Sequence, residues 1–177
     1  MCLFLFFIDK FAGLYANILV FYQIYQKLEN KIKFSDEYFM EIALKEAQNA
    51  FLEGEIPVGA VVVIENTIIA KAYNQTERLT DISAHAEIMA ITAASSFLGA
   101  KYLTQARLYV TLEPCIMCAG ALAWSQLGTL IYGATDERRG FARLKENILH
   151  PKTKIITNIL KEDCEAILKK FFQQLRN

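Results

Sequence analysis

Hydrophobic and polar positions follow a clear helix-then-strand order from residue 35 onward. Apolar side chains recur at helical spacing after a run of acidic residues suited to a helix N-terminus, and they are Phe39, Ile42, Ala43, Ala47, Ala50 and Phe51. Ser35 is placed to cap this helix, and Gly54 can close it. Residues 58–64 and 68–73 then predict two strands, and the short turn between them is typical of a hairpin.

The rest of the chain continues this alternation. Residues 84–97 predict a helix that ends near Gly99, and residues 107–112 predict a strand. Pro114 suits the first position of a third helix running to about residue 126. Two more strands are predicted, over residues 129–132 and near 154–157, and a charged loop over residues 136–145 separates them. The last helix carries one apolar stripe: Cys164, Ile167, Leu168, Phe171, Phe172 and Leu175. The pattern predicts a single α/β unit with a central mixed sheet of about five strands, covered by helices.

The first 33 residues follow a different pattern. They are rich in Phe, Leu, Ile and Tyr, and their first charged side chain is Asp9, whereas a signal peptide opens with positive charge. Their apolar runs, including the one over residues 11–25, are shorter than the ~20 residues of a spanning helix. We therefore interpret residues 1–33 as an apolar N-terminal extension of unknown role and expect no membrane partner, with a membrane anchor as the alternative. Residues 34–177 form the predicted working domain.

Composition fits one globular domain, since 54% of the 177 residues are apolar and 21% are charged. Nineteen basic and nineteen acidic residues cancel, so an RNA contact would need a local basic patch. Candidates for such a patch, each with an ordinary solvated surface as its alternative, are Arg138, Arg139, Arg143, Lys145, Lys152, Lys154, Lys169, Lys170 and Arg176. The four cysteines are too few and too unevenly spaced for a disulfide scaffold, which favours a cytoplasmic location.

Two short motifs carry the candidate chemistry. His85-Ala86-Glu87 opens one predicted helix, and Pro114-Cys115-Ile116-Met117-Cys118 opens the next. A helix N-terminus favours thiolates, and the spacing of the two cysteines turns both sulfurs to one side. If the two helix starts lie side by side, His85, Cys115 and Cys118 supply three ligands of a tetrahedral zinc site and leave the fourth position for water. Glu87 can take a proton from that water, whose pKa zinc lowers to roughly 7.

Each of these residues also has a structural explanation. A histidine at a helix start can be a cap, a Cys-x-x-Cys pair can be redox-active, and Glu87 can simply serve the helix dipole. A structural zinc site would need a fourth protein ligand, yet Cys164 belongs to the apolar stripe and His150 lies in a loop. A proton carrier beside an open position favours catalysis over a zinc ion that only braces an RNA-binding module.

H-x-E followed by P-C-x-x-C is the signature of zinc nucleobase deaminases. Further segments resemble the bacterial tRNA-specific adenosine deaminases, namely GEIPVGA at 54–60, AHAEIMA at 84–90, YVTLEPCIMCAG at 109–120 and YGATD at 132–136. The resemblance runs from about Phe34 to the C-terminus and does not include residues 1–33. It implies a cytidine-deaminase-like three-layer α/β/α sandwich and a homodimer with one Zn²⁺ per subunit.

The resemblance also implies a reaction and its site residues. Adenosine is converted to inosine at the wobble position of a tRNA anticodon stem-loop, and Glu87 acts as the catalytic proton shuttle. Asn74 matches a family position that hydrogen-bonds the flipped base. Asp136 matches a position near the ribose or the neighbouring nucleotide.

Other members of the superfamily are the alternatives. Free cytidine deaminases usually carry a third cysteine where this chain has His85. Riboflavin-pathway deaminases space their two cysteines more widely than Cys115 and Cys118. Guanine deaminases share the His-Cys-Cys ligand set and are the strongest alternative. The segments IPVGAVVV and YVTLEPCIMCAG favour the tRNA enzymes by resemblance.

Overall fold

The computed structural model describes residues 19–28 and 34–176. Residues 36–176 lie in one compact unit, while residues 19–28 are helical and lie in the other unit. Large apolar side chains are exposed on that helix, among them Phe21, Tyr22 and Tyr25. Within the described residues, no helix has both the length and the apolar character needed to cross a membrane. The remaining residues of the predicted extension lie outside the described part of the chain.

A five-stranded mixed sheet forms the centre of the larger unit, with the strand order β2-β1-β3-β4-β5. β1 (Gly59–Ile64) pairs antiparallel with both β2 (Thr67–Tyr73) and β3 (Ala106–Leu112). β3, β4 (Thr129–Ala134) and β5 (Lys154–Thr157) run parallel to one another. The predicted hairpin and the predicted mixed sheet of about five strands are confirmed.

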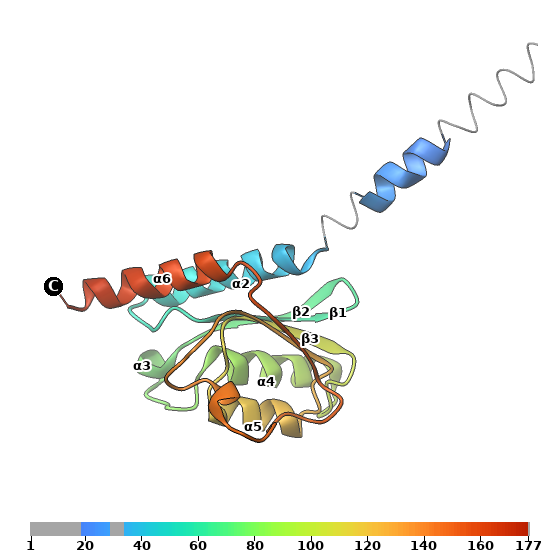
Figure 1. The fold of residues 1–177 in the computed structure, drawn as a ribbon. Coiled ribbons are helices and arrows are strands. Elements are labelled where there is room, and N and C mark those ends of the chain that lie inside the picture. The colour runs from blue at the N-terminus through green and yellow to red at the C-terminus, as the bar shows by residue number, and fades with distance from the viewer. Residues whose placement is uncertain (1–18, 29–33, 177) are drawn as a thin grey trace, which may run out of the picture. The chain divides into compact units, whose positions relative to one another are not determined.

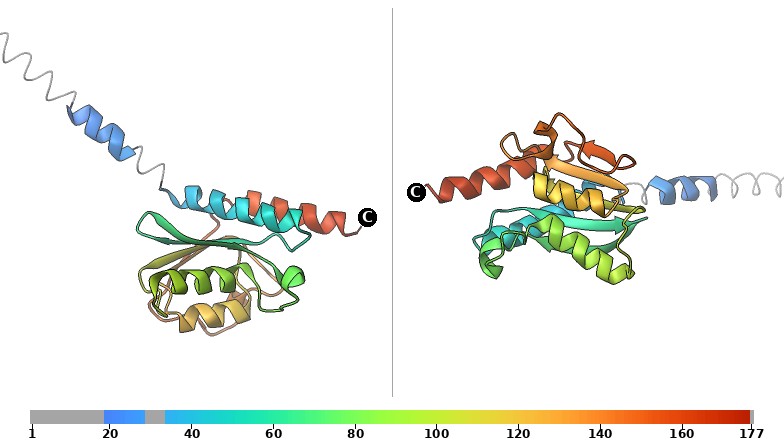
Figure 2. Two further views of the ribbon diagram at one scale, coloured as in Figure 1. Left: turned by 180° about the vertical axis from the view of Figure 1, so that it is seen from behind. Right: turned by 90° about the horizontal axis from the view of Figure 1, so that it is seen from below.

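Helices cover both faces of this sheet (Figures 1 and 2). α2 (Asp36–Leu52) and α6 (Lys161–Gln174) lie together on one face, and α4 (Ala86–Leu98) and α5 (Ile116–Trp124) lie on the other. Because both faces are covered, β1 and β3 are buried over nearly their whole length. The chain is therefore the expected three-layer α/β/α sandwich.

The two helices that carry the candidate motifs begin two residues later than predicted. His85 and Cys115 have extended backbones, with φ and ψ of −72° and 150° and of −71° and 171°, and act as N-cap residues. Pro114 therefore precedes the cap and is not the first helical residue. α5 also ends early, at Trp124, because Gln126 adopts a left-handed φ of 50°. The chain leaves α4 through Gly99 at φ 60°, as predicted.

Two features of the C-terminal half differ from the sequence prediction. The apolar stripe of α6 is only partly buried, because Cys164 and Phe171 face the interior while Phe172 and Leu175 are exposed. Two short helical turns were not predicted: α3 (Thr76–Leu79) and η1 (Phe141–Arg143). Both turns lie in connecting segments with no apolar period, so periodicity carried no signal for them.

Candidate active site

The two helix starts place their caps beside each other. His85 precedes the first residue of α4, and Cys115 precedes the first residue of α5, three residues after β3 ends. α4 and α5 pack against each other on the same face of the sheet. Both caps have the extended backbone of an N-cap residue, and their side chains contact each other. Cys118 completes the group from the first turn of α5, where it is fully buried.

His85, Cys115 and Cys118 form a compact donor set whose ligand atoms all lie within 4.8 Å of one another. The Nδ1 atom of His85 lies 3.7 Å from the Cys115 sulfur and 3.4 Å from the Cys118 sulfur. Bond lengths of about 2.3 Å to sulfur and about 2.0 Å to nitrogen place tetrahedral N and S ligands about 3.5 Å apart. The donor set therefore fits a tetrahedral zinc ion, with three protein ligands among residues 19–28 and 34–176 rather than the four of a structural site.

The three donors perturb one another strongly. A hydrogen bond from Cys118, helped by His85, lowers the pKa of the Cys115 thiol to about 4. The pKa of Cys118 is raised, because its thiol donates to Cys115 and because it is buried. The hydrogen bond with Cys115 raises the pKa of His85. The low pKa of Cys115 favours its thiolate form, and a bound cation would favour the thiolate of Cys118 as well.

Glu87 lies on the first turn of α4 and is only 4% exposed. Burial raises the pKa of its carboxyl to about 7, against the opposing effect of hydrogen bonding and of nearby His85. The interaction of its carboxyl with Cys118 lowers the pKa of Glu87 and raises that of the Cys118 thiol. The structure thus brings Glu87 to the donor set without making it a fourth member. A carboxyl that takes up and releases a proton near pH 7 is suited to acid–base catalysis.

Asn74 directly follows β2 and is 5% exposed. The N–H of Gln75 donates to the carbonyl of Ala84 at 2.9 Å, which holds the end of β2 next to His85. The side-chain nitrogen of Asn74 donates to Glu55 at 3.1 Å and to Thr76 at 3.2 Å. The Asn74 side chain is therefore held by Glu55 and Thr76, in a segment tied to the residue that precedes His85.

Asp136 begins the loop after β4 and is partly exposed. Its Oδ1 atom accepts the backbone N–H groups of Arg138 and Arg139, at 2.9 and 3.0 Å. The loop reaches the donor set through a β-bridge between Cys115 and Gly140. Asp136 thus lies in a segment tied to Cys115, and one of its oxygens shapes its own loop.

Sequence reasoning missed two buried glutamates that hold these segments in place. Glu55 is 1% exposed and anchors the Asn74 segment, and Glu113 is 3% exposed and anchors the Asp136 loop. Glu113 accepts the N–H groups of Asp136 at 3.1 Å and Ala142 at 2.9 Å. The available signal was a carboxylate in an otherwise apolar stretch, one or two residues before a proline, in LEPC and in GEIPVG.

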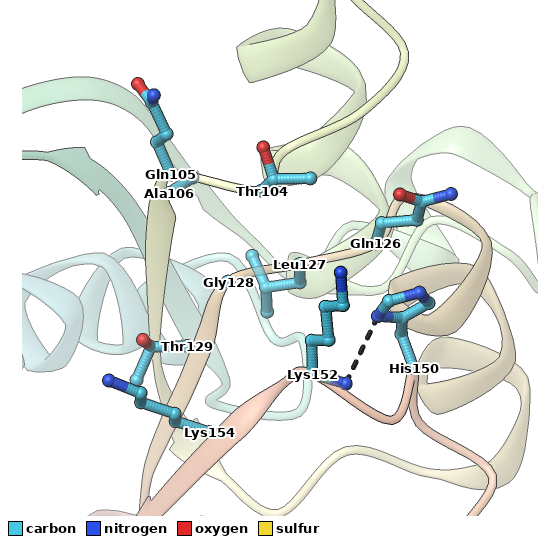
Figure 3. A pocket seen from close by; sticks show the side chains of 10 residues that line it. All are labelled: Thr104, Gln105, Ala106, Gln126, Leu127, Gly128, Thr129, His150, Lys152 and Lys154. Carbon is cyan, nitrogen blue, oxygen red and sulfur yellow. Dashed lines mark hydrogen bonds between the residues drawn. The ribbon is translucent and has the colours of Figure 1, made fainter.

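A separate cavity of about 400 Å³ lies at the opposite end of the parallel strands (Figure 3). Its wall includes the first residues of β3, β4 and β5, whereas the donor set follows the last residue of β3. His150, Lys152 and Lys154 also line it, and it contains neither histidine nor cysteine from the donor set. This cavity is therefore distinct from the candidate active site.

Known proteins are similar to this chain in sequence and in fold. The tRNA-specific adenosine deaminase of Aquifex aeolicus (strain VF5) is 47% identical over 146 residues, which cover 80% of this chain and 96% of that protein. A structure from a study of A-to-I editing by tRNA:A34 deaminases is 38% identical with a TM-score of 0.70, covering 74% of this chain and 99% of that chain. A Bacillus subtilis guanine deaminase is 39% identical with a TM-score of 0.54, over 56% of this chain and 64% of that one.

The family model for the cytidine and deoxycytidylate deaminase zinc-binding region matches residues 33–134. That range contains the whole donor set, together with Glu87 and Asn74. It also makes zinc the metal of this site. The chain belongs to the cytidine and deoxycytidylate deaminase family of zinc-dependent enzymes.

Proposed function

We propose that this protein deaminates adenosine to inosine, by hydrolysis, at wobble position 34 of a tRNA. The observation that carries the proposal is a three-ligand donor set with a buried carboxyl beside it, within a chain that matches tRNA adenosine deaminases along nearly their full length. The guanine deaminase match covers only 56% of this chain, which makes guanine the second candidate substrate. A tRNA substrate also favours a cytoplasmic location.

His85, Cys115 and Cys118 would hold the zinc ion. When bound, zinc supplies a water nucleophile that is activated at neutral pH. Glu87 accepts the proton that this water loses and delivers it to N1 of adenine as the C6–O bond forms. It then carries the proton of the new C6 hydroxyl group to the amino group, so that the C6–N bond breaks, ammonia leaves and the C6 carbonyl of inosine remains. Overall, adenosine and water give inosine and ammonia.

Asn74 and Asp136 are the proposed residues that hold the base next to the zinc ligands and Glu87. Asn74 would hydrogen-bond the base or its sugar, because its side chain is held in a segment tied to the residue that precedes His85. Asp136 would contact the ribose or the neighbouring nucleotide from a loop tied to Cys115. Bases of an anticodon loop are already largely unpaired, so turning one into the site costs less than flipping it from a duplex.

The reaction is tested with the purified, zinc-loaded protein and a tRNA transcript that carries A34. We expect inosine at position 34, measured by nucleoside mass spectrometry, and no change in a matched transcript with G34. Free guanine and cytidine are offered in parallel. Conversion of guanine to xanthine without inosine formation would replace the tRNA proposal with the second candidate.

We also propose that two copies associate through α5. This helix begins beside a ligand of the donor set, and its outer side exposes Ile116, Met117 and Trp124, the last by 86%. Exposed large apolar side chains that cluster on one helix mark a protein interface. A partner on this helix would lie next to the site and could contribute to substrate binding.

Trp124→Glu is expected to weaken the dimer by about 30-fold or more, because a buried tryptophan is commonly an energetic hot spot of an interface. Sedimentation velocity over a concentration series measures the change. Leu52→Glu is the matched control, since Leu52 is 74% exposed on α2, on the opposite face of the sheet. Dissociation by the Leu52 variant alone would place the interface on the other face.

A further inference from the structure

Glu55 is a fully buried carboxylate that no part of the reaction above uses. It is 1% exposed, and three donors from one short segment converge on it. Oε1 accepts the backbone N–H of Arg78 at 2.8 Å. Oε2 accepts the side-chain N–H of Asn74 at 3.1 Å and the hydroxyl of Thr76 at 3.1 Å. Such a group needs a reason to be buried, because desolvating a carboxylate is costly unless donors compensate it.

The backbone at the end of α2 turns Glu55 toward the interior. Gly54 takes a left-handed φ of 78° after α2, and the N–H of Glu55 donates back to the carbonyl of Ala50 at 2.9 Å. This closure is typical of a helix C-terminus and fixes the direction in which the next residue points. Glu55 is therefore placed by rigid backbone and not by a flexible loop.

The three hydrogen bonds determine which end of the Asn74 amide is free. Its nitrogen carries two hydrogens, and both have acceptors, one on Glu55 and one on Thr76. Its carbonyl oxygen has no hydrogen-bond partner among the described residues, and no side-chain oxygen there is both buried and unpartnered. Oδ1 therefore reaches the surface and remains available to a ligand.

We propose that Glu55 is a positioning residue that fixes Asn74 as a hydrogen-bond acceptor toward the substrate. This inference rests on the proposed function, in which Asn74 contacts the nucleoside. It adds that the substrate group met by Asn74 is an N–H or O–H donor. A ligand that offered only an acceptor there would leave Oδ1 unpaired and facing another lone pair.

Glu55→Gln is the informative substitution because it preserves size and removes one acceptor. A glutamine has a single carbonyl oxygen, and its NH₂ would face the donors of either Arg78 or Asn74. If the glutamine oxygen keeps the hydrogen bond from the Arg78 N–H, the glutamine NH₂ faces the NH₂ of Asn74. This donor–donor contact is relieved when the Asn74 amide turns over. Asn74 would then present its NH₂ group to the substrate in place of Oδ1.

The first measurement follows the Asn74 amide protons directly by NMR, with full-length zinc-loaded protein. The signals are assigned by their absence in Asn74→Ala. In the wild type we expect both protons to be protected from exchange with water, and in Glu55→Gln we expect that protection to be lost. Unprotected Asn74 amide protons in the wild type would overturn the proposal. This result does not depend on activity, so it stands even if the protein forms no inosine from tRNA.

The second measurement is a double-mutant cycle on inosine formation. Glu55→Gln is expected to raise KM about tenfold with little change in kcat, because an unpaired polar group facing the substrate weakens its binding. In the Asn74→Ala background, Glu55→Gln should have no further effect, since Glu55 acts through Asn74. Independent effects that multiply in the double variant would contradict the proposal.

Two further variants separate positioning from general stability. Glu53→Gln is the matched control, because Glu53 is an exposed carboxylate that binds the same segment through Arg78 and Tyr73. It should leave the Asn74 signals unchanged and KM within about twofold. If Glu55→Gln fails to fold, Thr76→Val replaces it, since that change removes the acceptor of the second Asn74 hydrogen together with one of the three donors to Glu55. Unchanged signals and KM in a folded Thr76→Val protein would overturn the proposal.

Discussion

Glu87→Ala is expected to retain zinc at the wild-type level and to lower kcat for inosine formation by about 1,000-fold, within the range that general acid–base catalysis contributes. Glu87 is 4% exposed beside the donor set but is not one of its three members. Its loss therefore removes the group that carries protons and leaves the ligands in place. Single-turnover inosine formation and zinc content by mass spectrometry measure the two quantities separately.

Glu87→Gln is the matched variant, because glutamine keeps the shape and polarity of the side chain but carries no exchangeable acid proton. We expect it to lose as much activity as Glu87→Ala and to retain its fold by circular dichroism. Loss of zinc together with unfolding in both variants would show that Glu87 is structural. Activity close to the wild type in Glu87→Gln would assign the proton transfer to another group.

The elements of the fold follow from the apolar period of the sequence, but their ends do not. Periodicity located five strands and four long helices because most of these strands and helices bury apolar side chains in the core. It placed the starts of α4 and α5 two residues too early, since His85 and Cys115 look permissible in a first helical turn. Their extended backbones are those of N-cap residues, and the residue types alone do not distinguish a cap from the first residue of the helix here.

The same distinction holds for the site. His85, Cys115 and Cys118 were predicted because ligands on helix starts have a recognisable short spacing, and the structure brings them together. Glu55 and Glu113 were missed because their partners lie 19–29 residues away and are partly backbone N–H groups, which every sequence contains. Buried carboxylates that anchor a loop are recognised only when burial and hydrogen bonds are known together.

Glu55 and Glu113 stabilise the site in the same way. Each is buried at the edge of the site and accepts hydrogen bonds from one connecting segment, the Asn74 segment for Glu55 and the Asp136 loop for Glu113. Gly140 belongs to this arrangement, because a Cβ there would lie 2.3 Å from the Glu113 carboxylate. The two segments that we propose to bind the substrate are thus held by buried carboxylates, one shortly after the end of α2 and one directly after β3.

Cys118→Ser is expected to lower zinc affinity by more than about 100-fold, and activity should fall with zinc content. Changes to groups that merely support a ligand already cost about 10- to 100-fold in metal affinity, and a directly coordinating sulfur should cost more. Cys118 is fully buried, so its sulfur cannot be replaced by a side chain arriving from solvent. Titration with a competing zinc chelator measures the affinity, and inosine formation is assayed on the same samples.

Cys164→Ser is the control for this loss, because Cys164 is also a fully buried thiol but lies on α6, against Gly133 of β4. Burying a hydroxyl there should lower the melting temperature, while zinc affinity and kcat per bound zinc stay at the wild-type values. Excess zinc should restore part of the activity of Cys118→Ser and none of the lost stability of Cys164→Ser. A Cys118→Ser protein that is fully active without zinc would refute the metal site, because two remaining donors cannot form the tetrahedral set on which the proposed reaction depends.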